Sequence, residues 1–219
     1  MASVTAAPRQ VQNGPPAASA GGCCGTSCVQ KNFGRLLKKT GVRRVLAFDE
    51  GRFGLKAWFR RRWCPCGVRP PWIVEDRYEW IWVYVAVEPT TGWSYVRLLP
   101  EITSGCLEIF CRALRQATGP QRIGLVWDGA GSHRSTQLHW PGNLVPLRLP
   151  AYSPELNPAE QLFRHLRKQL ANRLFGSLRE LETALSTELR HWQNNRAEIQ
   201  QLMGYPWWNK GVGILSSIP

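Results

Sequence analysis

Three acidic side chains occupy positions from which the folded chain could bring them together. Asp49 directly follows the apolar run 46–48, and Asp128 directly follows the apolar run 125–127. Both runs are typical of buried strands, and side chains at the ends of neighbouring strands in an α/β sheet converge on one crevice. A third carboxylate, Glu160, lies in the first turn of an expected helix. The three are therefore candidates for one shared site.

Carboxylates that converge in this way favour metal chemistry. Magnesium prefers oxygen ligands, and short acidic side chains can hold two such ions close together. A pair of ions about 4 Å apart can activate a water or hydroxyl group and stabilise the leaving oxygen of a phosphodiester. The candidate catalytic and metal-binding residues are thus Asp49, Asp128 and Glu160.

Each of these acids also has a simpler structural explanation. An aspartate at a strand end often caps the element that follows it. Glu160 could accept a hydrogen bond from the backbone N–H of Asn157 in a capping box, or pair with Arg164 one helical turn later. From spacing alone both kinds of explanation remain open, and for Glu160 the structural one is favoured.

The elements expected to position the acids form an α/β pattern. Apolar runs predict strands at 42–48, 55–62, 80–87, 93–99, 123–127 and 144–149. Spacings of three and four residues predict helices at 104–118, near 132–139, from 157 through Leu174, and from 177 through Trp192. This order favours a mixed sheet flanked by helices.

Composition divides the chain into three expected parts. Residues 1–30 carry one charge and are rich in Ala, Gly, Pro, Ser and Gln, so residues 1–40 are interpreted as a disordered, low-complexity segment. The folded domain is expected at 41–195, followed by a C-terminal tail at 196–219. No apolar run is long enough to cross a bilayer, and no secretory signal is evident, so no membrane partner is expected.

The charge of the chain favours a polyanionic partner. There are 28 Lys and Arg against 15 Asp and Glu, which gives a net charge of +13. Nucleic acid is the first candidate for such a protein. Arg60, Arg61 and Arg62 alternate with aromatic residues in a pattern typical of phosphate contact and base stacking, although a basic edge strand with a buried aromatic face would look the same. Arg164 and Lys168 share the helical face of Glu160 and could hold DNA phosphates or simply face solvent.

Seven cysteines and no signal peptide indicate a reducing compartment rather than a disulfide framework. The pairs Cys24/Cys28 and Cys64/Cys66 do not match a standard zinc finger, so structural zinc is not expected.

Three blocks of the sequence carry a family resemblance. Phe48-Asp49-Glu50, the stretch 127–133 (WDGAGSH) and the stretch 152–160 (YSPELNPAE) resemble the catalytic blocks of DDE transposases of the mariner superfamily, with the bacterial insertion-sequence branch most similar. The stretch 62–70 also resembles that branch. The last block is specific because it joins an extended segment, a proline-started helix and the third acid.

The resemblance implies a ribonuclease-H-like fold, two Mg²⁺ ions that Mn²⁺ can replace, and DNA strand cleavage followed by transfer of a 3′-hydroxyl. It implies that Asp49, Asp128 and Glu160 are the metal ligands, while Glu50 and His133 match motif positions without an assigned role. The implied substrate is double-stranded DNA, both transposon ends and target, bound by a homodimer in the nucleoid of the cytoplasm.

The sequence departs from the family pattern in two respects. Glu160 follows Asp128 by 32 positions, which is short for the family, and Trp140-Pro141-Gly142 suggests a trimmed helix in between. The family also carries helix-turn-helix DNA-binding modules before the first aspartate, whereas only 48 residues precede Asp49. A helix-turn-helix half that is encoded separately or joined by frameshifting is therefore expected. The alternative is an inactive remnant that only binds nucleic acid.

Overall fold

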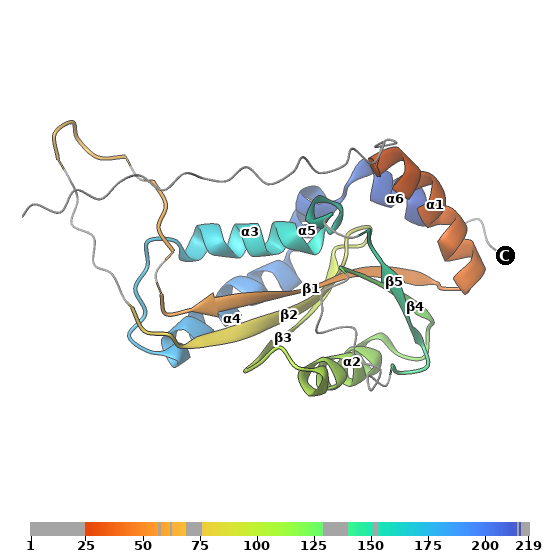
Figure 1. The fold of residues 1–219 in the computed structure, drawn as a ribbon, viewed down its shortest axis with the longest axis horizontal. Coiled ribbons are helices and arrows are strands. Elements are labelled where there is room, and N and C mark those ends of the chain that lie inside the picture. The colour runs from red at the N-terminus through yellow and green to blue at the C-terminus, as the bar shows by residue number, and fades with distance from the viewer. Residues whose placement is uncertain are drawn as a thin grey trace, which may run out of the picture.

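A five-stranded mixed sheet forms the centre of the molecule (Figure 1). The computed structural model describes residues 25–56, 58–61, 63–68, 76–128, 140–150, 153–213 and 215, with the backbone alone for 25–31. The strands are β1 (Arg44–Gly54), β2 (Trp80–Glu88), β3 (Trp93–Leu99), β4 (Ile123–Trp127) and β5 (Leu144–Arg148), in the order β3-β2-β1-β4-β5. Neighbours are antiparallel from β3 to β1 and parallel from β1 to β5. The expected mixed sheet is confirmed.

Strand β1 is longer than the sequence suggested, and this changes the position of the first acid. The expected strand ended at Phe48, but β1 continues to Gly54 because it pairs with β2 along Ala47–Gly54. Its parallel pairing with β4 covers only Arg44–Ala47. Asp49 therefore lies inside β1, just beyond the point where β4 separates from it. The second strand expected at 55–62 is absent from the described part of that stretch.

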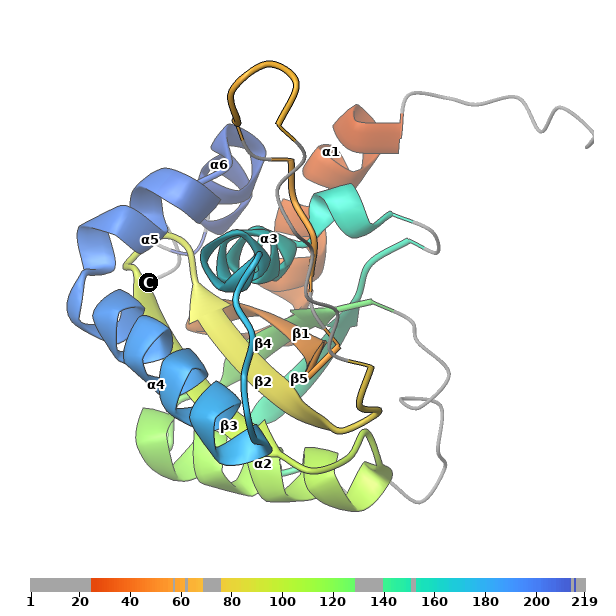
Figure 2. The same ribbon diagram turned by 90° about the vertical axis from the view of Figure 1, so that its left-hand side faces the viewer.

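Helices cover both faces of the sheet. Helix α2 (Ser104–Thr118) packs on one face. The other face carries α3 (Ala159–Leu170), α4 (Leu178–Asn194), α5 (Arg196–Met203), and the pair α1 (Gly25–Thr40) and α6 (Pro206–Gly213). Figure 2 shows α2 on the far side of the sheet from α3 and α4. A short 3₁₀ turn, η2 (Pro154–Leu156), leads into α3.

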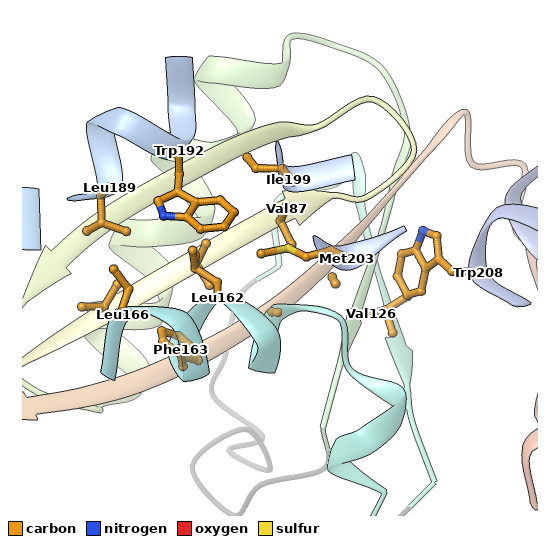
Figure 3. Close-up of a cluster of buried hydrophobic side chains, with 14 of the residues drawn as sticks. Val87, Val126, Leu162, Phe163, Leu166, Leu189, Trp192, Ile199, Met203 and Trp208 are labelled. Atoms are coloured by element: carbon orange, nitrogen blue, oxygen red, sulfur yellow. The ribbon is translucent and has the colours of Figure 1, made fainter. Parts of the chain in front are cut away.

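The alternation of side chains along each strand divides the core into two layers. Phe48 and Trp127 belong to the layer under α2, whereas Ala47 and Val126 belong to the layer under α3. In Figure 3, Leu162 and Leu166 of α3 point toward Trp192 and Leu189 of α4. Asp49 lies in register with the α3 layer, since it is two residues after Ala47.

Helix α1 was not expected from the sequence. Its Phe33 and Leu37 are buried, and the Phe33 ring packs on Trp207 and Trp208 at centroid distances of 5.8 and 5.4 Å. The segment was interpreted as disordered because its average composition is polar and small, which hid a single apolar stripe. Helices α5 and α6 likewise occupy the stretch expected to be a tail. Residues 1–24 lie outside the described part of the chain.

Several other expectations can be compared with the structure. The strands at 80–87, 93–99, 123–127 and 144–149 and the helices at 104–118 and from 177 are confirmed to within one residue at most ends. Helix α3 ends at Leu170 rather than continuing to Leu174, which is 44% exposed. The helix expected near 132–139 lies outside the described residues. Within the described ranges, no helix is long and apolar enough to span a membrane.

The packing of α6 predicts that Trp208 stabilises the whole domain. Its side chain is 0% exposed, and truncation of a buried Trp to Ala typically costs about 3–5 kcal/mol. We expect Trp208→Ala to lower the free energy of unfolding by that amount in urea denaturation. The control is Trp63→Ala at a fully exposed position, which should change the free energy of unfolding by no more than about 0.5 kcal/mol. Equal stability of the two variants would show that α6 is not part of the core.

Candidate active site

The pairing of β1 with β4 brings the first two acids to one edge of the sheet. Ala47 is the register partner of Val126, and this pair is the last in the parallel ladder. Asp49 and Asp128 each follow two residues later, so both continue the face of the sheet that α3 covers. Asp49 is buried at 8% exposure, whereas Asp128 is exposed.

The Phe163 ring of α3 packs directly on the backbone of β1 at Gly51. A Cβ atom at Gly51 would lie 2.5 Å from Cδ1 of Phe163, a distance that real Cβ atoms essentially never show. The Phe163 ring thus occupies the space that any other residue at 51 would need. Glu160 is one helical turn before Phe163 and is half-buried. The close approach therefore brings Glu160 to the same side of β1 as Asp49.

One buried amide connects the start of α3 to the residue before Asp49. Asn157 is 1% exposed, and its Nδ2 donates to the backbone carbonyl of Phe48 at 3.0 Å. Its Oδ1 accepts from the backbone N–H of Ala159 at 3.2 Å, and its carbonyl accepts from the N–H of Glu160 at 3.2 Å. Asn157 therefore fixes the first turn of α3 against β1, beside the first acid.

The structural explanations for Glu160 do not match these contacts. The N–H of Asn157, which a capping box would place on Glu160, donates instead to the carbonyl of Pro154 at 2.9 Å. Arg164 donates through Nη1 to Oε1 of Gln161 at 3.1 Å, and no ion pair joins it to Glu160 among the described residues. The Glu160 carboxylate therefore makes neither of the two helix contacts expected for it.

The electrostatics of Asp49 show that the acids influence one another. Burial raises the pKa of Asp49 well above its ordinary value, and the charges of Glu160, Glu50 and Asp128, in decreasing order, raise this pKa further. The backbone N–H of Glu50 donates to Oδ1 of Asp49 at 2.9 Å and opposes the rise. A buried carboxylate surrounded by other carboxylates is an arrangement that a divalent cation would stabilise.

The donor set fits a hard cation, although it is not a closed cage. All three acids offer carboxylate oxygens, which magnesium and manganese prefer. Among the described residues, no three His, Cys, Asp or Glu side chains lie close enough together to hold a metal ion as they stand. Binding would therefore require the side chains of Asp128 and Glu160 to turn toward the buried Asp49.

Glu50 faces the opposite layer of the core. Burial is the largest cause that raises the pKa of Tyr84, and the charge of Glu50 is the next. The same two causes, in the same order, raise the pKa of Cys111 to about 12. Both residues belong to the layer under α2. Glu50 is thus separated from Asp49 by the alternation of the strand, although the two charges still interact. His133 lies outside the described residues.

The basic residues predicted from the sequence lie at two places. Arg164 and Lys168 are exposed on α3, on the helix that carries Glu160. Arg60 and Arg61 are exposed near the far end of α3, where the N–H of Arg60 donates to Oδ1 of Asn172 at 3.0 Å. The helix rises about 15 Å between Glu160 and its last residue. Arg62 lies outside the described residues.

The aromatic residues around Arg60 and Arg61 do not form the buried face of an edge strand. Trp58, Phe59 and Trp63 are exposed by 42%, 47% and 103%. Trp58 also contacts a residue that sequence analysis missed, since the guanidinium of Arg167 lies 5.2 Å from its ring centroid. Arg167 lies over Phe53 and Phe163 as well, at 5.9 and 5.8 Å. It joins the segment after β1 to α3 through cation–π contacts.

Gly51 and Asn157 were also missed as residues that shape the site. The sequence predicts only a helix cap at Asn157, because its bond to Phe48 reaches a residue 109 positions away. Cys64 and Cys66 are exposed and form no disulfide.

Comparison with known proteins identifies the family. The family described as DDE superfamily endonuclease matches residues 44–182, which contain all three acids. The chain belongs to this family. The DDE endonuclease is also 28% identical over 137 residues to the uncharacterized protein y4pE/y4sA of Sinorhizobium fredii (strain NBRC 101917 / NGR234), which covers 62% of this chain and 94% of the relative.

Solved structures of the Mos1 transposase share the fold of this DDE endonuclease. The Mos1 strand transfer complex aligns with a TM-score of 0.60 and 17% identity over 86% of this chain. The paired-end complex of Mos1 with the left transposon end has a TM-score of 0.56 and 17% identity over 95% of this chain. The chain spans 60% and 67% of the length of those two chains. The ribonuclease-H-like fold and the resemblance to DDE transposases are confirmed, while the bacterial insertion-sequence branch stays a prediction.

The raised pKa of Asp49 predicts a distinctive dependence of stability on pH. A carboxyl group whose pKa is higher in the folded state binds its proton more tightly there, so stability falls as pH rises from 3.8, the ordinary pKa, through the raised one. In metal-free urea denaturation, Asp49→Asn should therefore be more stable than the unmodified chain near neutral pH. The two should converge in acid. Parallel pH profiles would contradict the buried, charged Asp49.

Proposed function

We propose that this DDE endonuclease domain is the catalytic domain of a transposase, which cleaves DNA strands with divalent metal ions and transfers a 3′-hydroxyl into target DNA. The observation that carries the proposal is the interaction of Glu160 and Asp128 with the buried Asp49, three acids that lie far apart in the sequence. Family membership supports the same chemistry.

Asp49, Asp128 and Glu160 are the residues that would hold two Mg²⁺ ions, with Mn²⁺ as a substitute. When bound, the ions would activate the attacking water or hydroxyl and stabilise the leaving oxygen of the phosphodiester. Two of the similar Mos1 structures are paired-end complexes described with Mn and with Mg. In this chain the fixed element is Asp49, which is buried within the sheet, whereas Asp128 and Glu160 are accessible to substrate.

The chain's own residues would position the reacting DNA. The contacts of Gly51 and Asn157 hold α3 against β1, which sets where Glu160 can reach. Arg164 and Lys168 follow Glu160 along the exposed side of α3 and are suited to the phosphates beside the scissile bond. Arg60, Arg61 and Arg62 would contact DNA farther from the acids.

The substrate class is double-stranded DNA, as transposon ends and as target. A net charge of +13 supports attraction to phosphates without sequence information. We infer that recognition of the transposon ends needs a helix-turn-helix half, that the active form is a dimer on DNA, and that the protein acts at the nucleoid. The proposed division of the chain is 1–40, 41–195 and 196–219, and α1, α5 and α6 of the two flanking parts pack onto the central domain.

The first prediction of this proposal concerns the three acids. Asp49→Ala, Asp128→Ala and Glu160→Ala should each reduce Mg²⁺- or Mn²⁺-dependent cleavage of labelled duplex DNA by about 100-fold or more, because one missing ligand disables the same step. The matched control is Asp76→Ala, since this aspartate is exposed and, among the described residues, pairs with Lys56 alone, at 3.6 Å. Cleavage that persists in the Glu160 variant would remove that residue from the site. No cleavage by the unmodified chain on any duplex would favour the inactive remnant.

The second prediction concerns the arginines after β1. Replacing Arg60, Arg61 and Arg62 with Ala should weaken duplex binding and lower the slope of log affinity against log salt by up to about 2.7, since each phosphate contact contributes about 0.9. The control replaces Arg112 and Arg115 of α2 and Arg122 before β4 with Ala. These three arginines are exposed, and their replacement removes the same charge. If both triple variants change the slope equally, the three arginines make no specific phosphate contact.

A further inference from the structure

A cleft of about 600 Å³ opens between helix α1 and the ends of strands β4 and β5. Its apolar lining includes Phe33 and Leu36 of α1 together with Val126 and Leu147 of the sheet. Leu36 is 41% exposed, which is unusual for a leucine that faces a domain core. In Figure 1, α1 and the two strands lie at the same end of the molecule, away from the segment that follows β1.

The floor of this cleft continues directly into the acidic site. Val126 and Leu147 are register partners in the β4–β5 ladder, and both belong to the core layer under α3. Asp128 follows Val126 by two residues on the same face, which corresponds to about 7 Å along a strand. The cleft and the acids therefore lie on one face of the sheet, next to each other.

Among the described residues, three cations line the cleft and no acidic residue does. Arg35 and Lys39 are one helical turn apart on α1, and Arg148 is the last residue of β5. All three side chains are exposed, and no ion pair or hydrogen bond joins any of them to another described residue. Unpaired cations around an apolar floor would repel one another and attract an anion that also carries apolar surface.

We propose that this cleft binds the sugar–phosphate backbone of a DNA strand that enters or leaves the acidic site. The phosphates would contact Arg35, Lys39 and Arg148, while a sugar or base would cover Leu36. A DNA strand suits this cleft better than a peptide does, because the charged residues in the described part of the lining are all cations and the floor continues into a site for phosphodiester chemistry. The assignment rests on the proposed function, and it adds a strand-binding site that neither the sequence nor the family match indicated.

The test compares two triple variants that each lower the net charge from +13 to +10. The cleft variant is Arg35→Ala, Lys39→Ala and Arg148→Ala. The control variant is Arg112→Ala and Arg115→Ala on α2 together with Arg122→Ala just before β4. Binding of the full-length chain to a labelled duplex is measured over a series of salt concentrations with EDTA. We expect the cleft variant to lose up to about 2.7 from the log–log salt slope, and the control variant to lose distinctly less.

A second substitution tests the apolar floor. Leu36→Glu places a negative charge in the cleft at an exposed position where folding tolerates it. It should weaken DNA binding at least 10-fold, whereas Ile109→Glu, on the exposed side of α2 at 51% exposure, should change binding much less.

Equal effects of the cleft and control triples, or an unchanged affinity of Leu36→Glu, would overturn the proposal and assign the cleft to a polypeptide segment. Because these measurements use no metal and no cleavage, they remain distinguishable from a failure of the catalytic proposal. A chain that binds DNA through the cleft yet does not cleave would contradict only the latter.

Discussion

The contact between Gly51 and Phe163 sets the geometry on which the rest of the site depends. At this contact an aromatic ring of α3 fills the place that a Cβ atom of β1 would occupy. The amide of Asn157 supplements this contact by joining the helix start to the carbonyl of Phe48. The two contacts lie on either side of Asp49 in the strand, so they determine together how Glu160 approaches it.

This arrangement opposes the stability of the domain. Asp49 is buried, and the nearest charges from Glu160, Glu50 and Asp128 have the same sign, so its ionised form is disfavoured. A fold that retains such a group has to stabilise itself elsewhere, and the two-layer core with Trp127 and Trp208 fully buried supplies that stability. A bound cation would therefore stabilise the site, and bound phosphates would neutralise the positive charge of the chain. Both features favour a polyanionic substrate that reacts with the help of metal ions.

The sequence predicted those parts of the fold that rest on local patterns. Helix α2 was expected because its apolar spacing, the Thr103 cap and Gly119 all agree, and Thr103 does accept from the N–H of Cys106. Strand β1 was predicted too short because Glu50 and Arg52 interrupt its apolar run, and only pairing with β2 reveals that the strand continues. Helix α1 was missed because its apolar stripe gains meaning only when Trp207 and Trp208, more than 170 residues later, cover it.

For the site, the acids could be predicted but their supports could not. Residue type and flanking runs indicated Asp49, Asp128 and Glu160, because metal chemistry restricts which side chains can serve. Gly51 and Arg167 carry no such local signal, since one acts by lacking a side chain and the other by stacking on rings from two elements. Long-range contacts of this kind follow from the fold and cannot be read from spacing.

The central claim is that three separated carboxylates form one divalent-metal site, and anomalous diffraction from a crystal of this chain soaked in Mn²⁺ tests it most directly. The account predicts a Mn²⁺ peak about 2.1 Å from a carboxylate oxygen of Asp49, with oxygens of Asp128 and Glu160 completing the site or holding a second ion. The account would be contradicted by a map at saturating Mn²⁺ that shows no peak beside Asp49 and shows the Glu160 carboxylate bonded to groups of its own helix.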